Sequence, residues 1–136
     1  MLSPTEIVDR MMSNDTMSQW LGIKVNSVSP GSVSCIMEVR SEMVNGFQIA
    51  HGGITYSLGD SALAFSVNSH GIHAVSVETS VSHLKPVKIG DTLTTQTREL
   101  SLSRKIGVYQ VDIFNQEKVL VATFKGTVYR TGQEWS

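Results

Sequence analysis

The sequence predicts an α+β domain in which a long central helix is wrapped by a curved antiparallel sheet of five to six strands. Two observations lead to this prediction. Residues 52–69 are apolar or small on nearly every side of a helix, and such a helix has to be buried on most of its faces. Much of the remaining chain alternates apolar and polar residues with the period of a β-strand, so strands are left to bury that helix.

The chain begins with the signature of a capped helix. Ser3 is suited to the N-cap, Pro4 to the first helical position and Glu6 to the reciprocal capping bond. We expect this helix to cover about residues 4–20. The period then changes to two, which predicts a strand pair around the turn at residues 29–32. Further alternating stretches predict strands near residues 74–84, 91–101, 106–114 and 119–129.

The length and composition predict one domain, residues 1–136, that is large enough to bury its own core. The near balance of 11 Lys and Arg against 12 Asp and Glu argues against a surface for nucleic acid or an anionic membrane. No apolar run approaches the ~20 residues that cross a bilayer, so we expect a cytoplasmic protein. The single cysteine, Cys35, occupies an apolar position of an alternating run and is expected to be a buried, inert thiol.

Asp60 is the one acidic or basic residue between His51 and His70, near the middle of the predicted buried helix. An ionised carboxylate loses hydration when it is buried, so a buried Asp60 is a candidate general base or nucleophile in a cleft. The structural alternative is that Asp60 faces water at a gap in the sheet or pairs with Ser57 and Ser61.

The segment 45–53 leads into the same helix and contains Asn45 and the run His51, Gly52, Gly53. Glycines at a helix N-terminus leave N–H groups open to close approach, and the helix dipole there favours a developing negative charge. This predicts an oxyanion hole. A tight turn is the alternative for the glycines, and Asn45 and His51 also fit ordinary loop roles.

Gly52 and Asp60 are eight positions apart, so on one straight helix their backbones lie roughly 12 Å from each other. They cannot both contact the same reacting carbon. If both serve one site, the amide of one subunit must face the carboxylate of another across a two-fold axis. The hypothesis of a site therefore carries a hypothesis of a homodimer.

Several motifs accompany these residues: Asn45, His51-Gly52-Gly53, Gly59-Asp60, Leu84-Lys85-Pro86 and Gly90-Asp91-Thr92-Leu93. With them, the chain resembles the hotdog-fold thioesterases of the phenylacetic-acid-degradation (PaaI-like) type over nearly its whole length. One departure is Gly59, where alanine is usual in the family. A glycine there costs the helix up to ~1 kcal/mol.

The resemblance implies a hotdog fold, a homodimer that is commonly doubled to a dimer of dimers, and hydrolysis of acyl-CoA thioesters without a cofactor. By the same resemblance, the Gly52 amide polarises the thioester carbonyl. Asp60 of the partner subunit activates water or attacks the carbonyl itself. A donor and a base of this kind suffice for thioester hydrolysis, because the thiolate of coenzyme A is a good leaving group.

The remaining catalytic candidates also come from the resemblance. Asn45 and His51 are implied to orient the thioester and shape the loop, and Ser76 is implied to position the water. The assignment of Ser76 depends on strand register, since a slip of two or three residues would give this place to Glu78 or Thr79.

Substrate contacts are expected from apolar residues near Asp60 and from basic residues in turns. Aryl-acetyl and medium-chain acyl groups are both compatible with this sequence. Candidates for the acyl and thioester contacts are Met43, Phe47, Gly53, Tyr56 and Leu63. Candidates for the phosphates of coenzyme A, for which solvated surface charge is an equal alternative, are Lys85, Lys88, Arg104 and Lys105.

Other classes of function have weaker support. The four histidines lack the spacing of a metal site, so no metal is expected. Hotdog hydratases and dehydratases typically place a histidine five residues after the helix aspartate, where this chain has Phe65. A non-catalytic acyl-CoA sensor or a ligand-free interaction module stays open. Asp60 and Gly52 favour an enzyme, because a pure binder gains nothing from a costly carboxylate beside a carbonyl.

Overall fold

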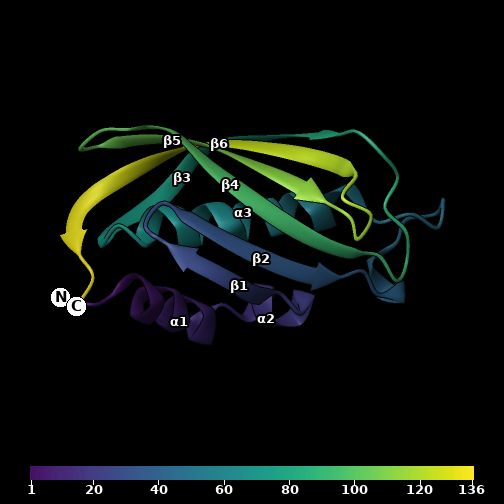
Figure 1. The fold of residues 1–136 in the computed structure, drawn as a ribbon, viewed down its shortest axis with the longest axis horizontal. Helices are drawn as coiled ribbons and strands as arrows, with labels where there is room; N and C mark the ends of the chain where they lie inside the picture. The colour runs from purple at the N-terminus through teal and green to yellow at the C-terminus, as the bar shows by residue number, and fades with distance from the viewer.

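The computed structural model describes all residues 1–136 and contains one six-stranded sheet that curves over a long helix (Figure 1). The expected α+β architecture is confirmed. The helices are α1 (Pro4–Asn14), α2 (Thr16–Leu21) and α3 (Gly52–Asn68), with a short 3-10 helix at Ser41–Met43. The strands are β1 (Lys24–Ser29), β2 (Ser32–Glu38), β3 (Ile72–His83), β4 (Thr92–Leu102), β5 (Ile106–Phe114) and β6 (Leu120–Glu134).

The sheet has the strand order β1-β2-β4-β5-β6-β3, and every neighbouring pair is antiparallel. β1 and β3 are therefore its two edge strands. β3 pairs with β6 along nearly its whole length, from Ile72 opposite Glu134 to His83 opposite Ala122. Its other edge has no strand beside it. An edge with free N–H and C=O groups is a template for pairing with a strand of another chain.

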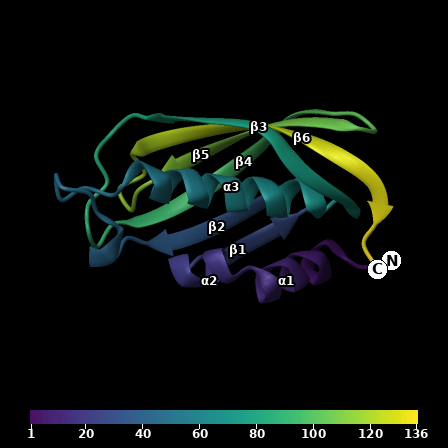
Figure 2. The ribbon, with the colours of Figure 1, turned by 180° about the vertical axis from the view of Figure 1, so that it is seen from behind.

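The helix α3 is buried on most of its sides, as its all-round apolar pattern predicts. Its half-buried residues follow one another at helical spacing, so they form one stripe, which we call the open stripe. The open stripe consists of Tyr56, Ser57, Asp60, Ser61 and Ala64. Seen from behind, most of α3 is in view, and β3 slopes down across its C-terminal end (Figure 2). No helix of the protein is long and apolar enough to cross a membrane.

Two buried serines, Ser66 in α3 and its C-cap Ser69, attach the end of the helix to β2 and to the turn before it. The N–H of Val33 donates to Ser66 Oγ and the N–H of Gly31 donates to Ser69 Oγ, each at 2.9 Å. These backbone groups thus find partners on the helix rather than on a strand, which keeps buried donors paired. Because both bonds are directional, they fix the position of α3 along the sheet, and with it the position of Asp60.

The N-terminal segment forms two helices, so the prediction of one helix over residues 4–20 is wrong. The capping box of Ser3 and Glu6 is present, but α1 ends at Asn14. Asp15 leaves the helical conformation, with φ −98° and ψ 85°, and its side chain accepts the N–H of Ser18 at 2.9 Å to cap α2. Aspartate side chains accept backbone N–H groups that would otherwise bond within a continuous helix. The spacing of apolar residues does not predict such a break.

Cys35 lies in the core with no exposed surface, which confirms the expected buried thiol. Burial raises the pKa of this thiol to about 12. The thiolate is the reactive form of cysteine. The folded protein therefore contributes no background when released thiols are assayed with a thiol reagent.

Gly59 packs directly against Phe124, and we expect Gly59→Ala to destabilise the fold. Helix propensity alone favours alanine by about 1 kcal/mol. However, a Cβ atom at Gly59 would lie 2.7 Å from Cγ and 2.8 Å from Cβ of Phe124. These two atoms join a fully buried ring to the backbone, so they cannot easily move aside. Overpacking of this kind costs about 1–3 kcal/mol. After the gain in helix propensity is subtracted, a net loss of up to about 2 kcal/mol is expected from urea unfolding.

The variant Phe124→Ala supplies the control for Gly59→Ala, because alanine lacks both Cγ and the ring. In that background, adding the methyl group at Gly59 should cost less. A single Gly59→Ala variant that is more stable than the wild type would contradict the steric account.

Candidate active site

Two separate pockets lie along α3. The first, of about 390 Å³, surrounds the start of the helix and includes Asn45, Gly52, Thr55, His83 and Lys85 among its lining residues. The second, of about 250 Å³, lies beside the middle of the helix. Its lining residues are Met11, Asp60, Leu63, Ala64, Val67, Asn68, Ala74, Val75, Ser76 and Val128. Gly52 and Asp60 therefore belong to different pockets of one protomer.

The first turn of α3 leaves the N–H of Gly52 unpaired. His51 is the N-cap, and its Nδ1 accepts the N–H of Gly53 at 2.9 Å. The N–H of Ile54 donates to the carbonyl of His51. The N–H of Gly52 has no acceptor in the protein, and Gly52 lines the pocket. Of the two glycine amides considered for an oxyanion hole, Gly53 is thus occupied and Gly52 is free to bind a ligand.

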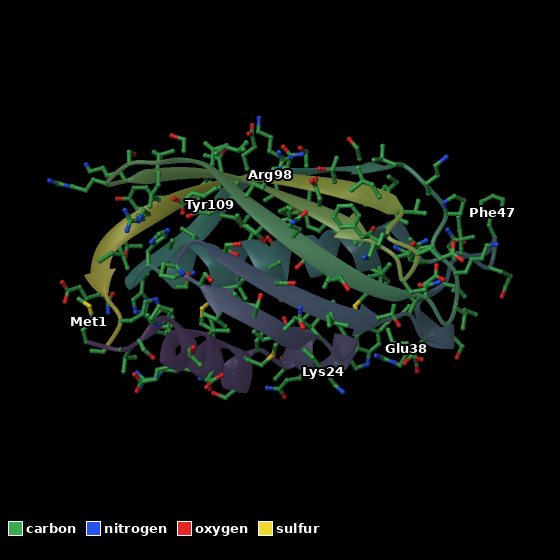
Figure 3. The ribbon with its side chains drawn as sticks, in the orientation of Figure 1. Met1, Lys24, Glu38, Phe47, Arg98 and Tyr109 are labelled. Carbon is green, nitrogen blue, oxygen red and sulfur yellow. The ribbon has the colours of Figure 1, made fainter.

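The loop before α3 is a tight turn built on Asn45. The N–H of Asn45 donates to the carbonyl of Ile49 at 2.8 Å, and Asn45 Oδ1 accepts the N–H of Phe47 at 2.9 Å. The carboxamide oxygen is therefore used inside the loop, which leaves the Nδ2 group as the donor that Asn45 can offer to the pocket. Phe47 is 85% exposed and lies at the end of the molecule (Figure 3).

His83 lines the Gly52 pocket. The sequence analysis treats it only as a possible metal ligand and predicts no role for it in the site. Its Nδ1 lies 3.2 Å from Thr55 Oγ1, and Thr55 Oγ1 donates to the carbonyl of Gly52 at 3.2 Å. A Cβ atom built on Gly52 would lie 3.1 Å from His83 Nε2. The imidazole thus stands directly beside the free amide. Nothing in its alternating strand distinguishes His83 from an ordinary surface residue, so the contact depends on the fold.

Asp60 lies on the open stripe of α3 and is half-buried. Of the two structural alternatives, pairing with Ser57 and Ser61 is absent, since neither serine bonds to the carboxylate and Ser61 Oγ lies 2.8 Å from Ser18 Oγ. The other alternative, that Asp60 faces water at a gap in the sheet, stays open, because the residue is partly exposed. No ion pair engages the Asp60 carboxylate. Burial raises its pKa above the ordinary value for aspartate, and the charge of nearby Asp15 raises it further. A partly desolvated carboxylate of raised basicity is suited to act as a base or nucleophile.

The register of β3 places Ser76 in the pocket of Asp60. Ser76 lies opposite Val128 of β6, whose side chain belongs to the core. A β-bulge follows Ser76, after which Glu78 is exposed, and Thr79 Oγ1 bonds with the hydroxyl of Tyr56. Of the three candidates that register left open, Ser76 is the one that shares a cavity with Asp60.

Comparisons with known proteins identify the family of this chain. The family model described as the thioesterase superfamily matches residues 47–122, more than half of the chain. The chain belongs to the thioesterase superfamily. It is 38% identical over 122 residues to the acyl-coenzyme A thioesterase PaaI of Escherichia coli (strain K12), covering 90% of this chain and 87% of that protein.

Solved structures show that this member of the thioesterase superfamily has the hotdog fold. The structure of the E. coli PaaI protein from the phenylacetic acid degradation operon matches with a TM-score of 0.94 at 34% identity, covering 98% of this chain and 96% of that one. The crystal structure of smu.793 from Streptococcus mutans UA159, bound to acetyl CoA, matches with a TM-score of 0.80 at 32% identity. It covers 83% of this chain and 91% of that one.

The apolar residues expected around the acyl group do not all reach one pocket of this thioesterase-superfamily chain. Leu63 lines the Asp60 pocket as expected. Met43 is fully buried in the core. Tyr56 packs edge-on against Phe124, with ring centroids 5.3 Å apart, and does not line the pocket. Periodicity marks all of these residues as apolar, but only the packing decides which of them face a cavity.

The basic candidates lie at opposite ends of the protomer. Lys85 lines the Gly52 pocket. Arg104 and Lys105 occupy the turn between β4 and β5, at the other end of the molecule from Phe47 (Figures 1 and 3). Lys88 is exposed in the loop before β4. Within one protomer, therefore, Lys85 alone among the four lines the pocket of the free amide.

Proposed function

We propose that this protein hydrolyses acyl-CoA thioesters at a site shared by two protomers. One observation carries the proposal: the same helix of a thioesterase-superfamily chain presents both an unpaired Gly52 N–H and a half-buried Asp60. Burial raises the pKa of Asp60. The relatives named as acyl-CoA thioesterases, and the S. mutans structure that holds acetyl CoA, support this choice of substrate class.

The two groups divide the chemistry of hydrolysis between them. The Gly52 N–H donates to the thioester carbonyl oxygen, where negative charge develops as the tetrahedral intermediate forms. Asp60 either takes the proton from an attacking water or attacks the carbonyl carbon to form an anhydride that water then cleaves. The C–S bond breaks, and coenzyme A departs as a thiolate. We assign Ser76 to hold the water, and Asn45 to donate to the thioester.

The separation of the two pockets supports a shared site. Gly52 and Asp60 lie roughly 12 Å apart along the helix, and they line different cavities. The open stripe that carries Asp60 and the free edge of β3 are both uncovered in one protomer. A second copy that pairs along β3 would cover both and bring its own Gly52 to this Asp60. Two such dimers would hold four identical sites.

The lining of the Asp60 pocket supports an apolar acyl group. Leu63, Ala64, Val67 and Val75 surround the carboxylate with aliphatic carbon. An aryl-acetyl or medium-chain acyl group would bury apolar surface there. Lys85, which lines the Gly52 pocket, is our candidate for a CoA phosphate. Arg104 and Lys105 could contribute to the same substrate only from another protomer.

A thiol-release assay across phenylacetyl-, benzoyl-, hexanoyl- and palmitoyl-CoA tests the proposal. We expect at least one of these substrates to be cleaved, with the rate proportional to protein concentration. A thiol reagent can report the product directly because Cys35 is buried. If the protein binds every acyl-CoA tightly but releases no thiol, it is a non-catalytic acyl-CoA sensor and not an enzyme.

The raised pKa of Asp60 predicts a specific dependence of the rate on pH. Asp60 must be ionised to act as base or nucleophile, so kcat/KM should fall as the pH is lowered through the pKa of Asp60. Because burial and Asp15 raise that pKa, the acidic limb should lie above the ordinary pKa of an aspartate. A rate that stays constant down to the ordinary range of an exposed carboxylate would contradict this role for Asp60.

A further inference from the structure

The first helix contributes a residue to the wall of the Asp60 pocket. Met11 of α1 lines the cavity together with residues of α3, β3 and β6. This N-terminal segment lies outside residues 47–122, which the family model matches. The segment therefore lines the same cavity as the proposed catalytic carboxylate, although the matched superfamily region does not include it.

A chain of hydrogen bonds connects the junction of α1 and α2 to the residue beside Asp60. Asp15 Oδ2 accepts the hydroxyl of Ser18 at 2.6 Å, and Ser18 Oγ lies 2.8 Å from Ser61 Oγ. Ser18 is only 1% exposed, so the chain is sheltered from water. Asp15 Oδ1 also accepts the backbone N–H of Ser18 at 2.9 Å. Both oxygens of Asp15 are thus held in place next to α3.

Asp15 supplies the ionised group that acts on Asp60. The other residues that line the pocket, from α1, α3, β3 and β6, are all uncharged. No cation pairs with Asp60, and the charge of Asp15 favours the protonated form of Asp60. Two nearby carboxylates resist simultaneous ionisation, so the more buried of the two, Asp60, holds its proton more tightly.

We propose that Asp15 is a positioning residue for the hydrolysis, which Ser18 and Ser61 hold beside α3 so that its negative charge acts on the carboxylate of Asp60. This inference rests on the proposed function and adds a role for the N-terminal segment. A more basic carboxylate removes a proton from water more effectively once it is ionised, but it is ionised over a narrower range of pH. Through Asp15, the segment α1–α2 thus adds to the effect of burial and shifts both the rate at neutral pH and the acidic limit of activity.

The test removes the charge of Asp15 while keeping the cap of α2. Asparagine and serine are N-cap residues as good as aspartate, so Asp15→Asn and Asp15→Ser should both retain the helix. Asp9→Asn is the matched control, because Asp9 is an exposed aspartate of α1 outside the pocket. Two measurements are made on the full chain: kcat/KM against pH, and the titration of the Asp60 carboxyl carbon by NMR.

In both Asp15 variants we expect the acidic limb of kcat/KM and the titration of Asp60 to move together to lower pH, with a lower rate on the plateau. Asp9→Asn should leave both unchanged. Loss of a structural contact alone would lower the rate without moving either midpoint. If Asp60 titrates at the same pH in Asp15→Asn, Asp15→Ser and Asp9→Asn, the inference is overturned. Failure of the proposed function is a separate result, since wild-type protein would then release no thiol.

Discussion

Replacing Asp60 by asparagine is expected to lower kcat by a factor of hundreds or more, with little change in the affinity for acyl-CoA. Asparagine has nearly the same shape but can neither accept a proton from water nor attack a carbonyl. The open stripe and its neighbours would keep their packing, because no hydrogen bond or ion pair to another residue depends on this carboxylate. Steady-state kinetics with the best substrate of the thiol-release panel gives kcat, and calorimetric titration with a non-hydrolysable analogue gives Kd.

Asp9→Asn is the control for the same change of charge and should retain the wild-type kcat. If Asp60→Asn keeps more than about a tenth of the wild-type kcat, Asp60 is not the base or nucleophile. Equal loss of kcat and of analogue binding would instead indicate a collapsed pocket.

Thermal unfolding separates the chemical role of Asp60 from a structural one. The folded protein binds the Asp60 proton more tightly than the unfolded chain does, since the pKa of Asp60 is raised by folding. Ionisation of Asp60 therefore opposes folding at any pH above its raised pKa, and this cost disappears at low pH where both states are protonated. We expect Asp60→Asn to have a higher Tm than the wild type at neutral pH and the same Tm near pH ~3. Lower stability at neutral pH would contradict the burial of an unpaired charge.

The central helix and the order of the strands along the chain could be predicted because periodicity records which residues are buried. The all-round apolar pattern of residues 52–69 matches the burial of α3, and the alternation at 106–114 coincides with β5. The break at Asp15 was missed because it depends on one side chain that captures a backbone donor. The spacing of apolar residues does not predict a helix break that one polar side chain causes.

The sequence predicts the candidate residues of the site, but not which residues of other elements contact them. The spacing of Gly52 and Asp60 on one helix predicts that they cannot contact the same reacting carbon within one protomer. Pairing across the sheet decides what else reaches them, and it places Ser76 beside Asp60 and His83 beside Gly52. Register and strand order are long-range properties, so neither contact follows from a local pattern. Arg104 and Lys105 occupy the turn between β4 and β5, away from the Gly52 pocket of their own protomer, so their contact with a CoA phosphate stays a prediction that requires a second protomer.

Replacing Gly52 by proline is expected to lower kcat by about 10²–10³-fold, since it deletes the N–H that would stabilise the oxyanion. Gly52 is the first residue of α3, where proline is well tolerated. His51 has φ −58° and ψ 141°, an extended conformation that suits the residue before a proline. The helix should therefore keep its start while losing one donor.

Gly52→Ala is the matched control, because alanine retains the N–H but adds the same Cβ atom. That atom would lie 3.1 Å from His83 Nε2, a tight contact that the end of a flexible side chain can relieve. We expect kcat of Gly52→Ala to stay within a few-fold of the wild type. If the alanine and proline variants lose the same activity, crowding at His83 and not the amide explains the effect.

Combining the two inactive variants tests whether one site draws on two chains. A heterodimer of Asp60→Asn and Gly52→Pro protomers, purified with two different tags, holds one site with both functional groups intact and one site with neither. Each homodimer holds only defective sites. If Gly52 of one protomer serves Asp60 of the other, the heterodimer should recover roughly half of the wild-type kcat per dimer. If both groups of a site came from the same chain, every site in the heterodimer would lack one group, and activity would stay at the level of the homodimers.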